Sequence, residues 1–325
     1  MRRRRGLARG SCGVALAAAL AAFGCAGVAS ERAAPAAATA TPLFWHAQAR
    51  EGGDFYLLGS VHVRAADAPA LGAEVVQAYD RSDQLVVEVD VSQITPVEIE
   101  AQTRRYATLP PHLRLDALLE PETREQLARY VAAHELPAEQ LQRYKPWFAS
   151  QMILMTELAA AGYDAALGVD RSFVDQASGE KPIAGLETLA SQFAMLDGQT
   201  LAVQELMLKD VLLRSDALVA RTGELLEAWS RGDEAALERE IFGPSDEAPE
   251  LESFYAAFFW QRNAAMTARL VELAGDGKTR FVVLGAGHML GAKGIPALLA
   301  QQGFAVERVI PGETSLSRDA AAPPP

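Results

Sequence analysis

The segment Phe55-Tyr-Leu-Leu-Gly-Ser-Val-His62 opens with four mostly apolar residues, which predict a buried strand, and it ends in a Gly-x-x-His motif. Near the other end of the chain, Phe281-Val-Val-Leu-Gly-Ala-Gly-His288 has the same apolar start, the same Leu-Gly step and the same spacing to its histidine. The two histidines are 288 − 62 = 226 positions apart. A histidine just past the end of a strand projects into the crevice where open α/β sheets bind ligands. We therefore expect the fold to bring His62 and His288 together.

The composition predicts a globular protein with an acidic surface. Of the 325 residues, 50% are hydrophobic, so the chain can bury a large core in one or two domains. Five of the 30 basic residues are arginines in the N-terminal segment, and without them the net charge is 30 − 5 − 42 = −17. Such a surface repels phosphate backbones, so we expect no nucleic-acid partner.

Residues 1–30 resemble an export signal. Arginines at positions 2–5 and 9 precede an almost uncharged, Ala/Leu-rich run over residues 11–23 that is too short to span a bilayer comfortably. Two alternative cleavage signals are present at the end of this segment. Ala22-Phe-Gly-Cys25 resembles a bacterial lipobox, which would leave Cys25 as a lipidated first residue, whereas Val28-Ala-Ser30 is a small-x-small cleavage site. We expect an exported protein, either periplasmic or anchored to the outer membrane as a lipoprotein.

Composition also divides the rest of the chain. Residues 31–41 are rich in Ala, Pro and Thr and predict a flexible tether, residues 42–311 predict the folded domain, and residues 312–325 predict a disordered tail. The other cysteine, Cys12, lies inside the signal segment. The mature domain therefore excludes a thiolate nucleophile and cysteine-ligated zinc.

The pattern of apolar residues predicts a sheet at both ends of the chain and helices between them. Residues 43–59 read as a hairpin, and the order of helix 68–79 and strand 84–90 after it predicts a parallel βαβ unit. The chain closes with strands over 281–284 and 304–310 around a helix. Residues 95–273 are mostly helical, apart from a short strand over 181–187. The predicted fold class is α/β (α+β), with a central mixed sheet built from both chain ends and a large helical insertion in the middle.

The two motifs predict a reactive centre. The glycines that open them, Gly59 and Gly285, allow a sharp bend or a close approach. In the strand over residues 84–90, Glu88 faces away from its apolar neighbours. An isolated histidine after a strand is usually structural, but the repetition of the Gly-x-x-His motif favours a function for His62 and His288. An acidic residue in an edge strand, such as Glu88, is usually solvated. Two imidazoles and a carboxylate suit a divalent transition metal with positions left open for water and substrate, which would support hydrolysis.

Other chemistry fits the sequence less well. Gly285-Ala-Gly287 resembles part of a dinucleotide-binding motif, but the next glycine, Gly291, comes one residue too late. The pair His134-Glu135 lacks the second histidine of a zincin, and the sequence has no Gly-x-Ser-x-Gly or P-loop motif. We expect His46 and His112 to be structural residues without partners.

The ordered set of short motifs resembles the TraB/GumN family, which includes the TIKI metalloproteases. The match covers nearly the whole mature chain and consists of both Gly-x-x-His motifs, Val87-Glu88, Lys145-Pro-Trp147, Gly168-Val-Asp170, Gly185-Leu-Glu-Thr188 and Arg262-Asn263. The resemblance implies an α/β core shared with erythromycin-esterase-like proteins and, in the TIKI branch, metal-dependent proteolysis at the two histidines. The family's Glu-Arg-Asn triplet reads Gln261-Arg262-Asn263 here, which puts a catalytic role at position 261 in doubt.

Three functions follow as hypotheses. The first is a metal-dependent peptidase in which His62, Glu88 and His288 hold Mn, Co or Zn. Arg262 and Asn263 would stabilise an oxyanion or orient substrate, and Glu187 would act as general base or orient a ligand. The second is a metal-independent esterase or peptidase with histidine–carboxylate pairs. The third is a surface protein that sequesters peptides in a groove lined by Trp147, Trp229 and Trp260. The oligomeric state is not predicted.

Overall fold

The computed structural model describes residues 39–134, 138–243 and 250–310 of the protein. The predicted export signal with Cys25, most of the predicted tether and the predicted tail lie outside these ranges. Ala40 and Thr41, at the end of the predicted tether, belong to the folded part: Ala40 is buried, and the Thr41 amide donates to the carbonyl of Ser230. Within the described residues, no helix is both long and apolar enough to cross a membrane.

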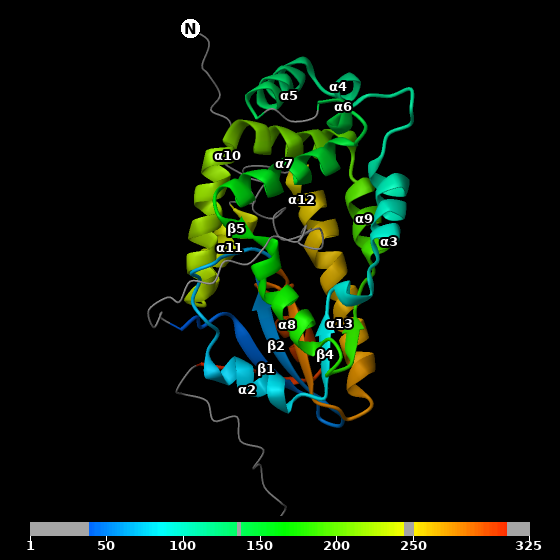
Figure 1. The fold of residues 1–325 in the computed structure, drawn as a ribbon. Helices are drawn as coiled ribbons and strands as arrows, with labels where there is room; N and C mark the ends of the chain where they lie inside the picture. Colours follow the sequence, from blue (N-terminus) through cyan, green and yellow to red (C-terminus); the bar gives the residue numbers. More distant parts are fainter. Residues whose placement is uncertain (1–38, 135–137, 244–249, 311–325) are drawn as a thin grey trace, which may run out of the picture.

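A mixed six-stranded sheet forms the lower half of the molecule in Figure 1. Its strands come from both ends of the chain, as predicted, with one short strand from the middle. In spatial order they are β6 (Ile183–Gly185), β4 (Gln84–Val87), β7 (Arg280–Gly285), β2 (Asp54–Ser60), β1 (Phe44–Gln48) and β8 (Ala305–Arg308). The four strands from β6 to β2 are parallel, whereas β1 is antiparallel to both of its neighbours.

The two strands that carry the repeated motifs are direct neighbours. In their parallel register Gly59 pairs with Leu284 and Ser60 pairs with Gly285, so both motifs leave the same edge of the sheet side by side. The predicted βαβ unit is correct in its parallel direction, but β2 and β4 do not touch each other because β7 lies between them. The last part of the chain therefore completes the centre of a sheet that the first part begins.

Helices cover both faces of the sheet. On the face toward the viewer in Figure 1, α2 (Ala73–Arg81) and α8 (Val169–Ala177) bring Tyr79 and Phe173 onto Phe281 of β7. Side chains alternate along a strand, so the neighbouring residues point to the opposite face. There Phe55 of β2 stacks on Phe304, which follows α14 (Ile295–Gln301). Packing on both faces explains why the central strands read as continuous apolar runs.

Most of the helical insertion lies above the carboxyl ends of the parallel strands in Figure 1, whereas α8 and α13 (Gln261–Ala274) lie beside the sheet. The centre of the insertion is the contact between the apolar helix α7 (Pro146–Ala160), which begins at a proline, and the long helix α10 (Leu201–Ser230), which is kinked at Arg214. The remaining helices are α3 (Pro96–Gln102), α4 (Leu115–Leu118), α5 (Pro121–Ala133), α6 (Ala138–Leu141), α9 (Leu189–Asp197), α11 (Glu234–Phe242) and α12 (Glu250–Tyr255).

The histidines outside the motifs are peripheral. His46 does have partners, contrary to expectation: its ring stacks on Tyr56, and Nε2 lies 3.4 Å from Asp54 Oδ2. These contacts bridge β1 and β2, so His46 is structural as predicted. His134 follows α5 and stacks on Tyr130, and His112 is exposed in a turn.

Candidate active site

The carboxyl ends of the four parallel strands bring the predicted site residues together. Glu187 comes two residues after β6, Glu88 follows β4, His62 comes two residues after β2, and β7 ends at Gly285 before a short 3₁₀ turn that carries His288. The sequence placed Glu88 inside its strand, but the strand ends at Val87, and Glu88 stands at the sheet edge where ligands bind in open α/β folds.

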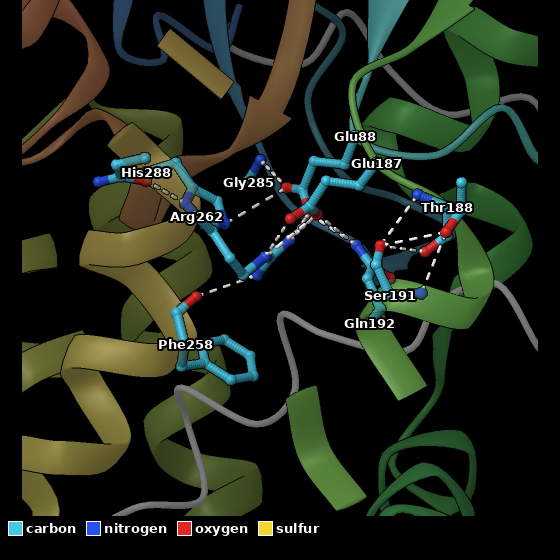
Figure 2. Close-up of polar contacts among 10 residues, drawn as sticks. Glu88, Glu187, Thr188, Ser191, Gln192, Phe258, Arg262, Gly285 and His288 are labelled. Carbon is cyan, nitrogen blue, oxygen red and sulfur yellow. Dashed lines mark hydrogen bonds and ion pairs between the residues drawn. The ribbon is translucent and has the colours of Figure 1, made fainter. Parts of the chain in front are cut away.

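Glu88 is a buried carboxylate whose two oxygens are both engaged (Figure 2). Oε1 accepts a hydrogen bond of 2.8 Å from the Gly285 amide, and Oε2 accepts one of 2.5 Å from Arg262 Nη2 and one of 3.2 Å from Gln192. His288 Nε2 lies 3.7 Å from Oε1. Burial alone would raise the pKa of Glu88, but the positive charges of the neighbouring groups and the Gly285 hydrogen bond lower it to about 2. Glu88 is therefore ionised at neutral pH.

Arg262 joins Glu88 to Glu187 in a buried ion triad. Its Nε donates to Glu187 Oε1 over 2.9 Å, Nη2 donates to Glu187 Oε2 over 2.6 Å, and Nη1 donates to the carbonyl of Phe258 over 3.1 Å. That carbonyl belongs to a π-helical turn, Ala256–Trp260, which leads into α13, and such turns are frequent at functional sites. Burial would lower the pKa of Arg262, but the two carboxylates hold it above its usual value, so the guanidinium stays charged.

His288 is held as a neutral imidazole. Asn263 donates from Nδ2 to the carbonyl of Lys293 over 2.8 Å, which turns its Oδ1 toward His288 Nδ1 at 2.5 Å. Because Oδ1 can only accept, Nδ1 carries the proton and Nε2 is left with a free lone pair. Burial, together with the positive charges of Arg262 and His62, lowers the pKa of His288 to about 3 against the opposing effect of Glu88.

His62 has the opposite charge state. Its Nδ1 lies 2.9 Å from Asp170 Oδ1, although the two groups are not aligned as a hydrogen bond, so we treat the contact as an ion pair. Burial would lower the pKa of His62, but Asp170 and Glu88 raise it to about 9. Its Nε2 is buried and has no hydrogen-bond partner among the described residues. The site thus contains one imidazolium and one neutral imidazole.

Asp170 reaches His62 because the start of α8 packs directly on the first motif. The Val169 amide donates to the carbonyl of Val61 over 2.9 Å, and a Cβ at Gly168 would lie only 2.5 Å from the carbonyl oxygen of His62. A side chain at position 168 would therefore push the helix away from the motif. Asp170 belongs to Gly168-Val-Asp170, one of the motifs shared with the TraB/GumN family, but the sequence did not indicate that it would contact His62.

Gly285 lies where the three predicted ligands converge. A Cβ at this position would be 3.2 Å from Glu88 Oε1, 3.4 Å from His62 Nε2 and 3.7 Å from His288 Cδ2. The first motif is fixed from the other side, because Trp229 Nε1 donates to the carbonyl of Gly59 over 2.7 Å. A Cβ at Gly59 would lie 3.3 Å from Ala286 Cα, so both motif glycines allow a close approach.

The donor set fits a divalent transition metal in chemistry once His62 gives up the Nε2 proton of its imidazolium, because a histidine binds metal only as the neutral ring. The Nδ1 atoms of His62 and His288 are oriented by Asp170 and Asn263, and the Nε2 atoms face inward with Glu88, as is usual for histidine ligands. The site is not preassembled, however: within residues 39–134, 138–243 and 250–310, no three His, Cys, Asp or Glu side chains lie close enough together to hold an ion. Two of the candidate donor atoms, His288 Nε2 and Glu88 Oε1, lie 3.7 Å apart.

Three residues were predicted to act on the substrate, but in the structure their side chains bind other groups of the protein. Arg262 is bound to two carboxylates, Asn263 is bound to His288 and Lys293, and Glu187 is bound to Arg262. Gln261, the position where the resemblance leads us to expect a glutamate, is exposed and is not part of the triad. Sequence reasoning also missed Gln192 of α9, which donates to both Glu88 and Glu187 and has no sequence signal of its own.

The tryptophans expected to line a groove are mostly core residues. Trp147 and Trp229 are buried. Trp260 is half-buried and lies under the ammonium group of Lys293. A groove lined by these three side chains is therefore not formed.

Comparison with known proteins agrees with the resemblance seen in the motifs. The profile of the TraB/PrgY/gumN family matches residues 43–308. The chain is 25% identical over 248 residues to the uncharacterized protein YbaP of Escherichia coli (strain K12), covering 75% of this chain and 87% of that protein. YbaP of Shigella flexneri is 25% identical over 247 residues, with the same coverage. No solved structure matches the chain. Because the family profile spans most of its length, this chain belongs to the TraB/PrgY/gumN family.

Proposed function

We propose that this protein is a hydrolase of peptide bonds whose reactive centre is formed by His62, Glu88 and His288. The observation that carries the proposal is the pair of histidines whose Nδ1 atoms contact Asp170 and Asn263. His62 Nε2 is buried without a hydrogen-bond partner among the described residues, and His288 Nε2 lies 3.7 Å from Glu88 Oε1. A buried polar atom without a partner is costly unless a ligand completes it. The strand ends of an α/β sheet are also where such ligands bind.

In the first form of the proposal, His62, Glu88 and His288 hold a divalent ion such as Mn, Co or Zn. The ion would supply an activated water and polarise the carbonyl of the substrate. Asn263 keeps the proton of His288 on Nδ1, which leaves Nε2 free to bind. Arg262 keeps Glu88 ionised, and Glu187 with Gln192 holds Arg262 and Glu88 in place. Arg262 and Asn263 are thus positioning residues rather than groups that contact the oxyanion.

In the second form the same residues work without a metal. The observation that favours it is the difference between the two histidines: His62 beside Asp170 is charged, whereas His288 is neutral. Pairs of groups whose pKa values are driven apart are a usual arrangement for an acid and a base. His288 Nε2 would accept the proton of the attacking water, and His62 Nε2–H would donate one to the leaving group of a peptide or ester.

The experiment that separates these forms is elemental analysis of the purified protein, compared with the double variant His62→Ala/His288→Ala and the control His112→Ala. Cleavage of a mixed peptide library is followed by mass spectrometry with and without chelator. Metal that is bound by the wild type and lost in the double variant supports the first form. Cleavage that resists chelator in metal-free protein selects the second. If the wild type leaves every peptide and ester intact, the hydrolase proposal is wrong, and tight peptide binding without products would identify a sequestering protein.

Export and lipidation are proposed from residues 1–30 alone. Labelling of the cells with a radioactive fatty acid should mark the wild type and leave Cys25→Ala unlabelled. Equal labelling of both would place the modification elsewhere, and no labelling of either would favour cleavage after Ser30.

A further inference from the structure

A small pocket opens directly beside His62, between the two motifs and the helices α10 and α11. Its volume is about 40 Å³. The floor is the chain of both motifs as they leave the sheet, from Ser60 to Val63 and at Ala286 and Gly287. The walls come from α10 and α11. The pocket thus shares His62 with the candidate active site, whereas Arg262 and the two glutamates do not line it.

The pocket wall is chemically simple. Leu225, Leu226 and Ile241 supply apolar side chains. Thr222 is polar, but its hydroxyl already donates to the carbonyl of Leu218 over 2.8 Å within α10. The lining therefore offers a surface that favours an aliphatic group over water or a charge.

One further polar group, in the floor of the pocket, has no hydrogen-bond partner among the described residues. Ser60 is 2% exposed, and its Oγ makes no hydrogen bond to any described residue. In native proteins most buried hydroxyls are satisfied, and an exception needs an explanation. A bound peptide with an aliphatic side chain in the pocket would bring its own main-chain amide or carbonyl to the pocket floor. There the hydroxyl of Ser60 can form a hydrogen bond with it.

We propose that this pocket is the specificity subsite of the enzyme, and that it takes the aliphatic side chain of the substrate residue next to the bond that is cleaved. The position of the cleaved bond beside the pocket rests on the proposed hydrolase function. The pocket and its apolar lining do not depend on how the attacking water is activated. The substrate class is peptides with Val, Leu, Ile or Met beside the cleavage point.

The activity test changes the size of the pocket. Leu226→Trp fills it, Leu226→Ala enlarges it, and Leu213→Trp makes the same exchange at an exposed position of the same helix. The wild type should prefer aliphatic residues at one subsite of the peptide library. Leu226→Trp should lower kcat/KM for these peptides about tenfold or more while sparing Ala and Gly, and Leu226→Ala should shift the preference toward Phe. Leu213→Trp should behave as the wild type.

A binding test needs no turnover. The protein is labelled with ¹³C at the methyl groups of Leu and Ile and titrated with N-acetyl-leucine-N-methylamide, and N-acetyl-glycine-N-methylamide serves as the matched probe. Only the leucine compound should shift the methyl signals of Leu226 and Ile241, while the signals of Leu213 stay in place. The shifts should disappear in Leu226→Trp, whose fold is checked by its remaining methyl spectrum.

The outcomes separate the two proposals. Cleavage by the wild type with the same side-chain profile in all three variants would overturn the subsite and leave the hydrolase. Selective shifts at Leu226 and Ile241 without any cleavage would keep the subsite and overturn the hydrolase. Equal shifts with both probes, or none with either, would overturn the subsite whatever the activity.

Discussion

Asn263 Oδ1 accepts the Nδ1 proton of His288, and this hydrogen bond of 2.5 Å decides that Nε2 is the free nitrogen of the second motif. In Asn263→Asp a carboxylate replaces the amide oxygen, so the pKa of His288 should rise from about 3 and the ring should become an imidazolium at higher pH. We expect activity to fall about 10- to 100-fold, as is typical when a group that orients a functional histidine is changed. The ¹⁵N shifts of His288 between pH 3 and 8 measure this. A wild-type ring that titrates near pH 6.5 would contradict the assignment.

Replacing Asp170 by Asn should change stability in an alkaline window. The folded-state pKa of His62 is raised from 6.5 to about 9, so its stabilisation is complete below pH 6.5 and is lost as the pH rises through 9. The free energy of unfolding of the wild type should therefore fall between these values, by on the order of 1–3 kcal/mol.

In Asp170→Asn this slope should flatten, and kcat should fall more than KM changes. Urea denaturation at each pH gives the slope. Asp175→Asn, an exposed carboxylate of the same helix, is the control and should keep the wild-type curve. An unchanged slope in Asp170→Asn would mean that the contact with His62 does not set its charge.

Arg262→Met should be strongly destabilising. The change leaves Glu88 and Glu187 close together in a buried place without their common partner, which typically costs about 3–5 kcal/mol. Loss of the guanidinium should also raise the pKa of Glu88, because a positive charge that favours its ionised form is gone. The protein should therefore be most impaired above neutral pH and recover partly on acidification. Arg269→Met on the exposed side of the same helix should stay within about 0.5 kcal/mol of the wild type.

Gly285→Ala should damage the site more than the fold. The added methyl group would lie 3.2 Å from Glu88 Oε1 and 3.4 Å from His62 Nε2, so these side chains must move by a few tenths of an ångström. We expect activity and any bound metal to be lost while the melting temperature drops only a few degrees. Gly275→Ala, whose methyl group would make an ordinary 3.4 Å contact at the end of α13, is the matched control. Full activity in Gly285→Ala would show that the three residues do not act together.

The repeated motif was enough to predict that the fold brings His62 and His288 to one place. The structure of an apolar run followed by Gly-x-x-His is determined locally, because strand formation and the bend after the strand depend on residues close in sequence. The spacing of apolar residues then assigned the middle of the chain to helices. The parallel position of β7 between β2 and β4 was not visible, because a buried strand reads the same wherever it stands in a sheet.

The partners of the site residues could not be predicted for a related reason. Asp170 meets His62, and Gln192 meets Glu88, only because helices from the insertion return to the sheet edge. Arg262 lies beside the other predicted site residues, but its ion pairs with two carboxylates depend on strands that are distant in sequence. Residue type indicated which groups were chemically capable, whereas tertiary contacts decided what each one does.

The central position of β7 also governs how the chain can fold. Until residue 285 has been made, β2 and β4 each present an unpaired edge where the middle strand belongs. Pairing of strands so far apart in sequence is slow, because a long loop must close before any contact forms. An incomplete chain is therefore prone to aggregate through these edges. A fragment that ends before β7 lacks both the sheet centre and the second histidine, so the proposed reactive centre cannot form until residues 280–288 have joined the sheet.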